Sequence, residues 1–360
     1  MGAAERRGGM KTSRPVAAIA AGFATLALVI GFASPAVASP PVSSINLNCD
    51  KLAAAVDPPA SFTVPVAQRY ASASLERDFG GIPDTDYVQM AGGLACEWSN
   101  NLPLAPGSSA GGVGVRVEYL PYAASGYWRW ASVLGPVTTP DDFTCVSVPS
   151  DSCQFMSSAG GDWLFVEVQD ASSEAVAEDL SRRISTALQL GQKTPYVPPV
   201  YATPLPHTCQ TLIRPTVYGA AIGTRTPLVA WPAPPGWSPV NSAMLINRGL
   251  FCEMDDATGS FGGGRIQALP GGQWAFALLR SSLTTPGPLT PLRAAGMRAG
   301  DAAFTRCDAT HRHCVLDALI ATHWIEVDLL PSTLGGDLIT RDRLTASRLL
   351  LREIVGQIYP

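Results

Sequence analysis

A G-x-S-x-G pentapeptide at 107–111 contains the first residue that could do chemistry, Ser109. In α/β-hydrolases this motif exposes a serine nucleophile on a sharp turn between a strand and a helix. Here the preceding NLPLAP lacks the pattern of a buried strand, and the following GVGVRVEY is typical of a strand rather than a helix. We therefore predict a hairpin turn. A secreted hydrolase that uses Ser109 or an unrecognised carboxylate pair remains an alternative.

Three of the four histidines, His311, His313 and His323, lie close to Cys314 in the sequence. Imidazole and thiolate groups are good metal ligands. We expect this cysteine to be oxidised, however, and the corresponding loop earlier in the chain has no histidine. The favoured interpretation is a solvated loop, with no metal and no cofactor. A metal- or cofactor-handling protein centred on His311 and His313 is the alternative.

The segment GYWRW at 126–130 concentrates three aromatic side chains, Tyr127, Trp128 and Trp130. In a strand, alternation would place the two tryptophans on one face. Aromatic rings offer a large apolar area with little loss of entropy, which suits stacking on a sugar or gripping an acyl chain. Packing in the core is the competing interpretation. These three residues are the candidate ligand-binding residues.

Glu97 and Glu253 invite comparison with the paired carboxylates of acid–base catalysis, which lie a few ångströms apart. Each follows a cysteine in an alternating strand pattern, so each is expected on a solvated or partly covered face. We interpret them as surface or salt-bridged residues, with a polar ligand rim as the alternative. No catalytic residue is predicted; an enzymatic activity stays open, but the sequence favours a non-catalytic role.

These positions belong to a tandem duplication. GGLACEWSN at 92–100 matches RGLFCEMDD at 248–256, and WLFVEV at 163–168 matches WIEVDL at 324–329. Both copies begin with a cysteine-bearing helical pattern and end with an amphipathic one. We predict an α+β fold of two tandem homologous domains. Each is an antiparallel sheet packed with an N-terminal and a C-terminal helix and stapled by disulfides.

The eight cysteines indicate four disulfides in an exported chain. If both copies pair alike and within themselves, only three of the 105 connectivities remain. We favour a long-range and a short-range pair in each copy, namely Cys49–Cys96, Cys145–Cys153, Cys209–Cys252 and Cys307–Cys314.

The chain begins with the pattern of a secretory signal, predicted over 1–38: a basic segment, an apolar run and the cleavage site Ala36-Val37-Ala38. Either Met1 or Met10 fits as the start, and an uncleaved N-terminal anchor is the alternative. The domains are predicted at 39–193 and 207–360. Between them, 194–206 contains five prolines in thirteen residues, which predicts a stiff extended connector.

Charge and hydropathy narrow the classes of partner. Residues 1–38 contain four of the 25 basic and one of the 29 acidic residues, so the remainder carries 21 basic and 28 acidic residues, a net charge of −7. A mildly acidic surface without a basic run argues against nucleic acid as a partner. No later apolar run reaches the length of a membrane-spanning helix, so we expect a secreted protein or one held at the cell envelope.

The cysteine-bearing helix, the C-E-W strand at 96–98, the later cysteine pair and the closing helix follow a secretory signal. This order resembles that of small exported domains of actinobacterial cell-envelope proteins of unknown function. The chain differs from lipoproteins of that kind because no cysteine lies at the cleavage site. The resemblance implies a cell-envelope location, and a cell-envelope component or a small apolar or glycan ligand as partner. We expect a non-catalytic binding or structural protein whose ligand the sequence does not identify.

Overall fold

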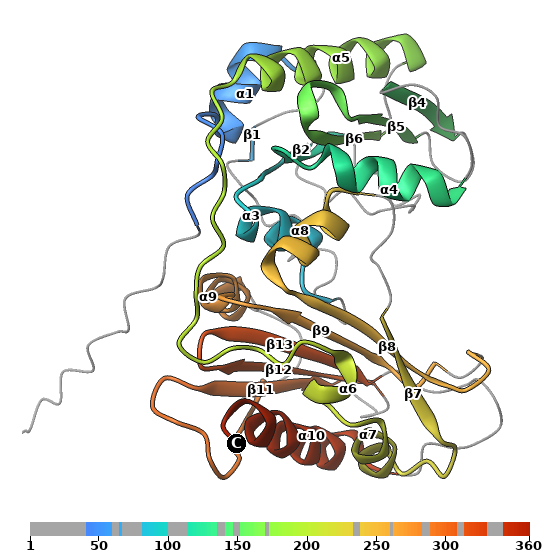
Figure 1. Ribbon diagram of the computed structural model, residues 1–360, viewed down its shortest axis with the longest axis vertical. Coiled ribbons are helices and arrows are strands. Elements are labelled where there is room, and N and C mark those ends of the chain that lie inside the picture. The colour runs from blue at the N-terminus through green and yellow to red at the C-terminus, as the bar shows by residue number, and fades with distance from the viewer. Residues whose placement is uncertain are drawn as a thin grey trace, which may run out of the picture. The chain divides into compact units, whose positions relative to one another are not determined.

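The computed structural model describes the chain over residues 41–59, 65–66, 81–99, 114–134, 141–146, 152–169, 173–232, 238–259, 262–282, 289–307, 313–329 and 341–360 (Figure 1). These residues belong to one compact unit. The predicted signal segment 1–38, the pentapeptide at 107–111 and His311 lie outside the described residues.

The first copy forms an antiparallel sheet in which six strands are described, in the order β1-β2-β3-β6-β5-β4. The strands are β1 (Pro65–Val66), β2 (Leu94–Ser99), β3 (Gly114–Leu120), β4 (Asp141–Val146), β5 (Ser152–Ser157) and β6 (Trp163–Gln169). A short 3-10 turn, Ala159–Gly161, joins the last two strands.

The second copy forms an antiparallel sheet with seven described strands, in the order β10-β11-β12-β13-β9-β8-β7. They are β7 (Leu228–Pro232), β8 (Leu250–Asp256), β9 (Arg265–Leu269), β10 (Thr290–Leu292), β11 (Ala302–Cys307), β12 (Cys314–Ile320) and β13 (His323–Leu329). The order β8-β9-β13-β12-β11 repeats the order β2-β3-β6-β5-β4 of the first sheet. The predicted α+β class with an antiparallel sheet in each copy is confirmed.

One face of each sheet is covered by the predicted terminal helices (Figure 1). These are α1 (Cys49–Val56) and α5 (Glu174–Leu190) in the first copy, and α6 (Cys209–Leu212), α7 (Pro215–Ile222) and α10 (Arg343–Ile358) in the second. The hydroxyl of Ser173 accepts a hydrogen bond from the Val176 amide and caps α5, and Asp342 caps α10 in the same way. Helical spacing then buries one apolar stripe of each helix against its sheet.

The other face of each sheet is covered by helices that the sequence analysis did not predict. They are α3 (Asp84–Met90) and α4 (Ala124–Leu134) in the first copy, and α8 (Val240–Asn247) and α9 (Gln273–Ser282) in the second. Helices α3 and α8 contact each other, and a single apolar cluster draws its residues from both copies. The two copies therefore share one core layer in addition to the core that each has alone.

Within the layer that they share, both copies have the same kind of contact between two aromatic rings. Tyr127 packs edge-on against Trp163 at 6.0 Å between ring centroids, and Phe276 packs edge-on against Trp324 at 6.3 Å. Each pair joins the helix after the second matched strand, β3 or β9, to the start of the fifth, β6 or β13. Edge-to-face pairs of this kind contribute about 0.5–1.5 kcal/mol beyond the area they bury.

The strand interpretation of 126–130 is wrong, because these residues lie in helix α4. Aromatic residues favour strands, but packing of the helix on the sheet overrides that local preference. Residues two apart in a helix do not share a face. The alternation argument for a common aromatic platform therefore no longer applies.

The structure contains four disulfides, and no free cysteine remains. They join Cys49 to Cys96, Cys145 to Cys153, Cys209 to Cys252 and Cys307 to Cys314, the pairs favoured from the repeat. In each copy the long-range bridge joins the first helix, α1 or α6, to the strand β2 or β8. The short-range bridge joins the two strands of a hairpin, β4–β5 or β11–β12. Within the described part of the chain, no helix has the length and hydropathy needed to cross a membrane.

Removing the long-range bridge should destabilise the protein more than removing the short-range one. The two bridges of the first copy close loops of 47 and 8 residues. On the chain-entropy argument they contribute about 4 and about 2.5 kcal/mol. We expect Cys49→Ala/Cys96→Ala to lower the free energy of unfolding by about 1.5 kcal/mol more than Cys145→Ala/Cys153→Ala, measured by urea denaturation. Equal losses would contradict this account.

Candidate functional site

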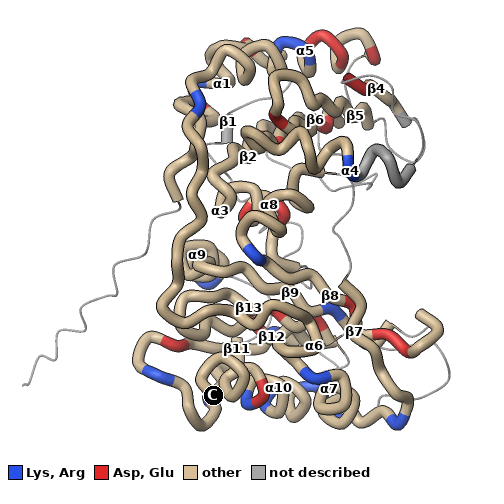
Figure 2. The backbone as a smooth tube through the Cα atoms, viewed as in Figure 1, with Lys and Arg blue, Asp and Glu red and all other residues tan. Residues whose placement is uncertain are grey.

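The connector, residues 194–206, is fixed to both copies. The Tyr196 hydroxyl donates a hydrogen bond to the Met90 carbonyl at the end of α3. The Tyr201 hydroxyl donates to the Pro270 carbonyl at 3.1 Å, in the turn after β9. Burial raises the pKa of both phenols to about 12, so both remain donors at neutral pH. Figure 2 shows the connector in tan throughout, because it contains no charged residue.

The beginning of the connector is held by a buried aspartate. Lys193 forms an ion pair with Asp162, which also accepts a hydrogen bond from the Tyr119 hydroxyl at 2.6 Å and from the Tyr122 amide at 3.0 Å. The Asp162 side chain is 2% exposed. Buried carboxylates that accept several charge-assisted hydrogen bonds fix backbone geometry locally, and here they fix where the connector leaves the first copy.

The next anchor is His323, at the start of β13. Its Nε2 lies 2.6 Å from the Thr203 carbonyl, and its Nδ1 lies 3.4 Å from the Gly271 amide nitrogen. Burial lowers the pKa of His323, which favours the neutral ring. This network assigns the proton to Nε2, which donates to the connector, while Nδ1 accepts. His323 therefore holds the connector in place, and His313 lies at the other end of the β12–β13 pair.

Glycine occurs where the two connector tyrosines approach the backbone. Gly92 and Gly271 both have a positive φ, at 74° and 70°. A Cβ at Gly92 would overlap the Tyr196 ring, and a Cβ at Gly271 would overlap the Tyr201 ring. Each turn therefore needs glycine for its backbone conformation and for the close approach of a ring.

At the position that matches each of these glycines in the other copy, the chain has a residue with a side chain, and its backbone is also left-handed. By the alignment of 92–100 with 248–256, Arg248 matches Gly92, and its φ is 57°. Tyr122 matches Gly271, and its φ is 60°. A left-handed conformation is uncommon for residues other than glycine and costs about 1 kcal/mol or more. In each pair of matched turns, the turn that contacts the connector therefore has glycine, and its counterpart in the other copy has a residue with a side chain.

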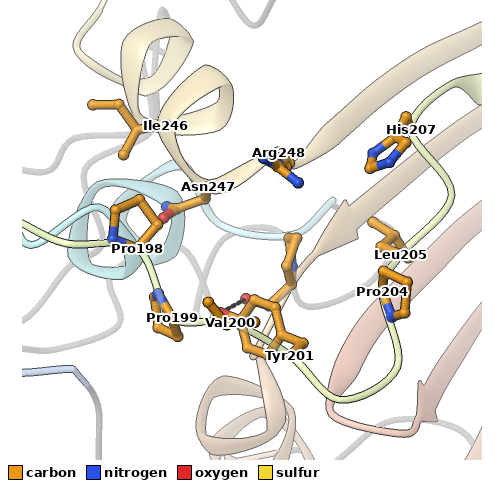
Figure 3. Close-up of a pocket in the computed structure, with 11 residues that line it drawn as sticks. Pro198, Pro199, Val200, Tyr201, Pro204, Leu205, His207, Ile246, Asn247 and Arg248 are labelled. Carbon is orange, nitrogen blue, oxygen red and sulfur yellow. Dashed lines mark hydrogen bonds between the residues drawn. The ribbon is translucent and has the colours of Figure 1, made fainter.

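A cavity of about 390 Å³ lies where the connector passes the end of α8 (Figure 3). The connector forms a curved wall, and Arg248, at the end of α8, lines the cavity together with it (Figure 3). The cavity is lined mainly by apolar groups from three segments of the chain, namely Pro198, Pro199, Val200, Tyr201, Pro204, Leu205, His207, Ile246, Asn247, Arg248 and Pro270. Its volume falls within the range of small-molecule sites, about 300–1,000 Å³.

The lining has one permanent charge, and it is positive. None of the lining residues is acidic, and Arg248 forms no ion pair with any residue that the structure describes. His207 is exposed at the same rim. Asn247, in contrast, is occupied: its side-chain amide donates to the Tyr87 carbonyl at 3.2 Å. The cavity thus combines mainly apolar walls with one permanently charged side chain, the guanidinium group of Arg248.

A second polar feature lies between the sheets and is duplicated. Across neighbouring strands, Glu97, Arg116 and Glu167 are in register in the first copy. Glu253, Arg265 and Asp328 form the matched row in the second. Burial alone lowers the pKa of Arg116, but the carboxylates of Glu118, Asp84 and Glu167 outweigh burial and raise it above its ordinary value.

Glu97 is 4% exposed, so the face opposite the cysteine is covered more fully than the alternation argument indicated. In the second copy, Arg306 bonds to Asp317 at 2.9 Å and to Glu326 at 3.5 Å on the same face. These rows consist of acids matched with arginines that the sheet register brings together. We therefore assign them a structural role in the layer shared by the two copies.

Tyr127 and Trp128, two of the three residues predicted to bind a ligand, do not line the cavity. Tyr127 is buried against Trp163, and Trp128 is 42% exposed on α4. The side chain of Trp130 lies outside the described residues, and ligand binding at these positions stays a prediction. His313 contacts Asp328 at 2.5 Å, and among the described residues no group of three or more acidic, histidine or cysteine side chains is arranged to hold a metal ion.

Sequence reasoning missed the cavity because its residues are separated along the chain. The signal that could have revealed it is the replacement of Gly92 by Arg248 within an otherwise matched G-L-x-C-E line. No family model, curated protein or solved structure matches this chain. The cavity is therefore interpreted from its own chemistry.

Gly92→Ala should destabilise the protein by releasing the connector. The substitution adds a left-handed strain and a methyl group that displaces the Tyr196 ring. Gly161, with φ 86° and nothing within 4 Å of an added Cβ, provides a matched control for strain alone. We expect Gly161→Ala to cost about 1 kcal/mol and Gly92→Ala about 1–2 kcal/mol more in chemical denaturation. Equal costs would show that Tyr196 does not pack on this turn in solution.

Asp84 should make stability depend on pH. Its carboxylate lies 3.5 Å from Arg116, and burial raises its pKa to about 6 although 38% of the side chain is accessible. A raised pKa in the folded state means that stability is lost as pH rises from about 4 to about 6. We expect Asp84→Asn to melt at a higher temperature than the wild type at pH 7, with the difference narrowing at pH 4.

The control for this comparison is Asp179→Asn, on the exposed surface of α5. This variant should show no comparable narrowing. A melting difference between Asp84→Asn and the wild type that stays constant from pH 4 to pH 7 would contradict the assignment to Asp84.

Proposed function

We propose that this chain is an exported, non-catalytic binding protein of the cell envelope, and that the cavity under the connector is its ligand site. The two tandem domains act as a frame, and the connector supplies one wall of the site. The observation that carries this proposal is the cavity of about 390 Å³ lined by connector residues, the end of α8 and the turn after β9.

The walls of the cavity support binding without a large rearrangement. Four of the lining residues are prolines, whose φ is fixed in advance. The hydrogen bonds that Tyr201 and His323 make hold the connector in place against the second copy. Binding to a wall that is already ordered costs less entropy than binding to a mobile loop, so more of the contact energy appears as affinity.

Four disulfides support the cell exterior as the location, because such bridges persist in oxidising compartments. The signal pattern of residues 1–38 points the same way. The structure does not test the alternatives of a secreted hydrolase and a metal-handling protein, because Ser109 and His311 lie outside the described residues.

The proposal is tested with anilinonaphthalene sulfonate, a dye with an apolar body whose fluorescence rises in apolar cavities. We expect saturable binding by the folded, disulfide-intact protein. Ile246→Trp places a larger side chain in the lining and should weaken binding about tenfold or more. Leu245→Trp is the matched control, because Leu245 is the preceding helix residue, is 66% exposed and is not part of the lining.

Hydrogen exchange then locates the bound dye. Protection should appear at the amides of 200–205 and 246–248 and not along α5. Equal affinity for both tryptophan variants, or protection confined to other segments, would refute the assignment of this cavity as the ligand site. Melting curves of both variants establish that the protein used in the titration is folded.

A further inference from the structure

We infer that the ligand of this cavity is an amphiphilic anion, with an apolar body against the proline wall and one carboxylate or phosphate group paired with Arg248. This inference rests on the proposed function and specifies the chemistry of its ligand. Three independent features of the site lead to it: the backbone of Arg248, the charge of the lining and the nature of the walls.

The backbone of Arg248 favours glycine, yet the residue is arginine. Its φ of 57° places it in the left-handed region at the end of α8. The matched position of the first copy is Gly92, where the Tyr196 ring leaves no room for a side chain. At Arg248 a side chain is accommodated because the cavity lies beside it (Figure 3). A residue held in an unfavourable conformation at a cavity points to a role for its side chain.

The charge of the lining selects an anion. Arg248 is exposed, has no ion-pair partner among the described residues and faces a lining without acids. The chain beyond residue 38 carries a net charge of −7, which repels anions at long range. A local arginine offsets that repulsion at one place, and its planar guanidinium group binds carboxylate or phosphate through two parallel hydrogen bonds.

The walls select an apolar body. Apart from Arg248, His207 and Asn247, the lining consists of prolines, aliphatic side chains and Tyr201. The amide of Asn247 already bonds to Tyr87 and its oxygen lies 3.5 Å from the Tyr196 hydroxyl. A polyhydroxylated ligand such as a glycan would find few hydrogen-bonding partners on such a surface, whereas an alkyl chain or other apolar group needs none.

The test uses three ligands with the same alkyl chain: decanoate, decyl phosphate and decanol. Binding to the full disulfide-intact protein is measured by calorimetry at pH 7.5 and low salt. We expect at least one of the two anions to bind about tenfold more tightly than decanol, and the preference to weaken as salt is added. The stronger of the two anions identifies a carboxylate or a phosphate as the natural head group.

Arg248→Gly is the decisive variant, since glycine accepts the backbone conformation of this turn and matches the first copy. Its melting temperature should equal or exceed that of the wild type. Its affinity for the preferred anion should fall about tenfold, while its affinity for decanol stays unchanged. Arg225→Gln removes one exposed charge outside the lining and should change neither affinity.

Two results separate the inference from the proposed function. If decanol and the anions bind the wild type equally well, or if Arg248→Gly keeps the full anion preference, the anion inference is refuted and the cavity remains a binding site. If none of the three ligands binds the wild type although the dye does, the anion inference is refuted and the cavity remains a binding site. If neither the dye nor the three ligands bind, the proposed function fails as well.

Discussion

Each sheet of this protein is buried on both faces, and this constraint determines how the two copies are joined. One face packs on the terminal helices, as expected for an α+β domain. The other face presents Trp163 in the first copy and Trp324 in the second, both 1% exposed. In a single copy, the inner helices that cover this second face would leave their own outer sides in water. The opposite copy covers those sides, so the duplication completes the core of each half.

The duplicated halves are equivalent in their sheets but not around the connector. A connector that passes once between two equivalent domains cannot contact both in the same way. It packs Tyr196 on the turn after α3 and Tyr201 on the turn after β9, and both turns have glycine. The two matched turns that it does not cover, at Arg248 and Tyr122, keep side chains. Of these, Arg248 lies beside the cavity, so the cavity arises where the symmetry between the copies is broken.

The outer half of each domain could be predicted from the sequence, because its signals are local or repeated. The apolar spacing of α5 and α10, the alternation of β2 and β3 and the positions of the cysteines each recur in two copies. The inner helices could not be predicted in this way. Helix α4 is rich in aromatic residues that favour strands, and α3 and α8 are short segments that pack on each other across the two copies. Local propensity does not contain that information.

The cavity could not be predicted from the sequence, because separate segments of the chain line it and support it. For the same reason it would not form in one copy alone. Its lining requires the connector, the end of α8 and the turn after β9 at once. The connector takes its path from Asp162 and Met90 in the first copy and from Pro270 and His323 in the second. The site is therefore a property of the tandem arrangement, and truncation to either half removes a support of its wall. A binding function that depends on both halves would favour retention of the duplication as a unit, even though each half has its own sheet, disulfides and outer core.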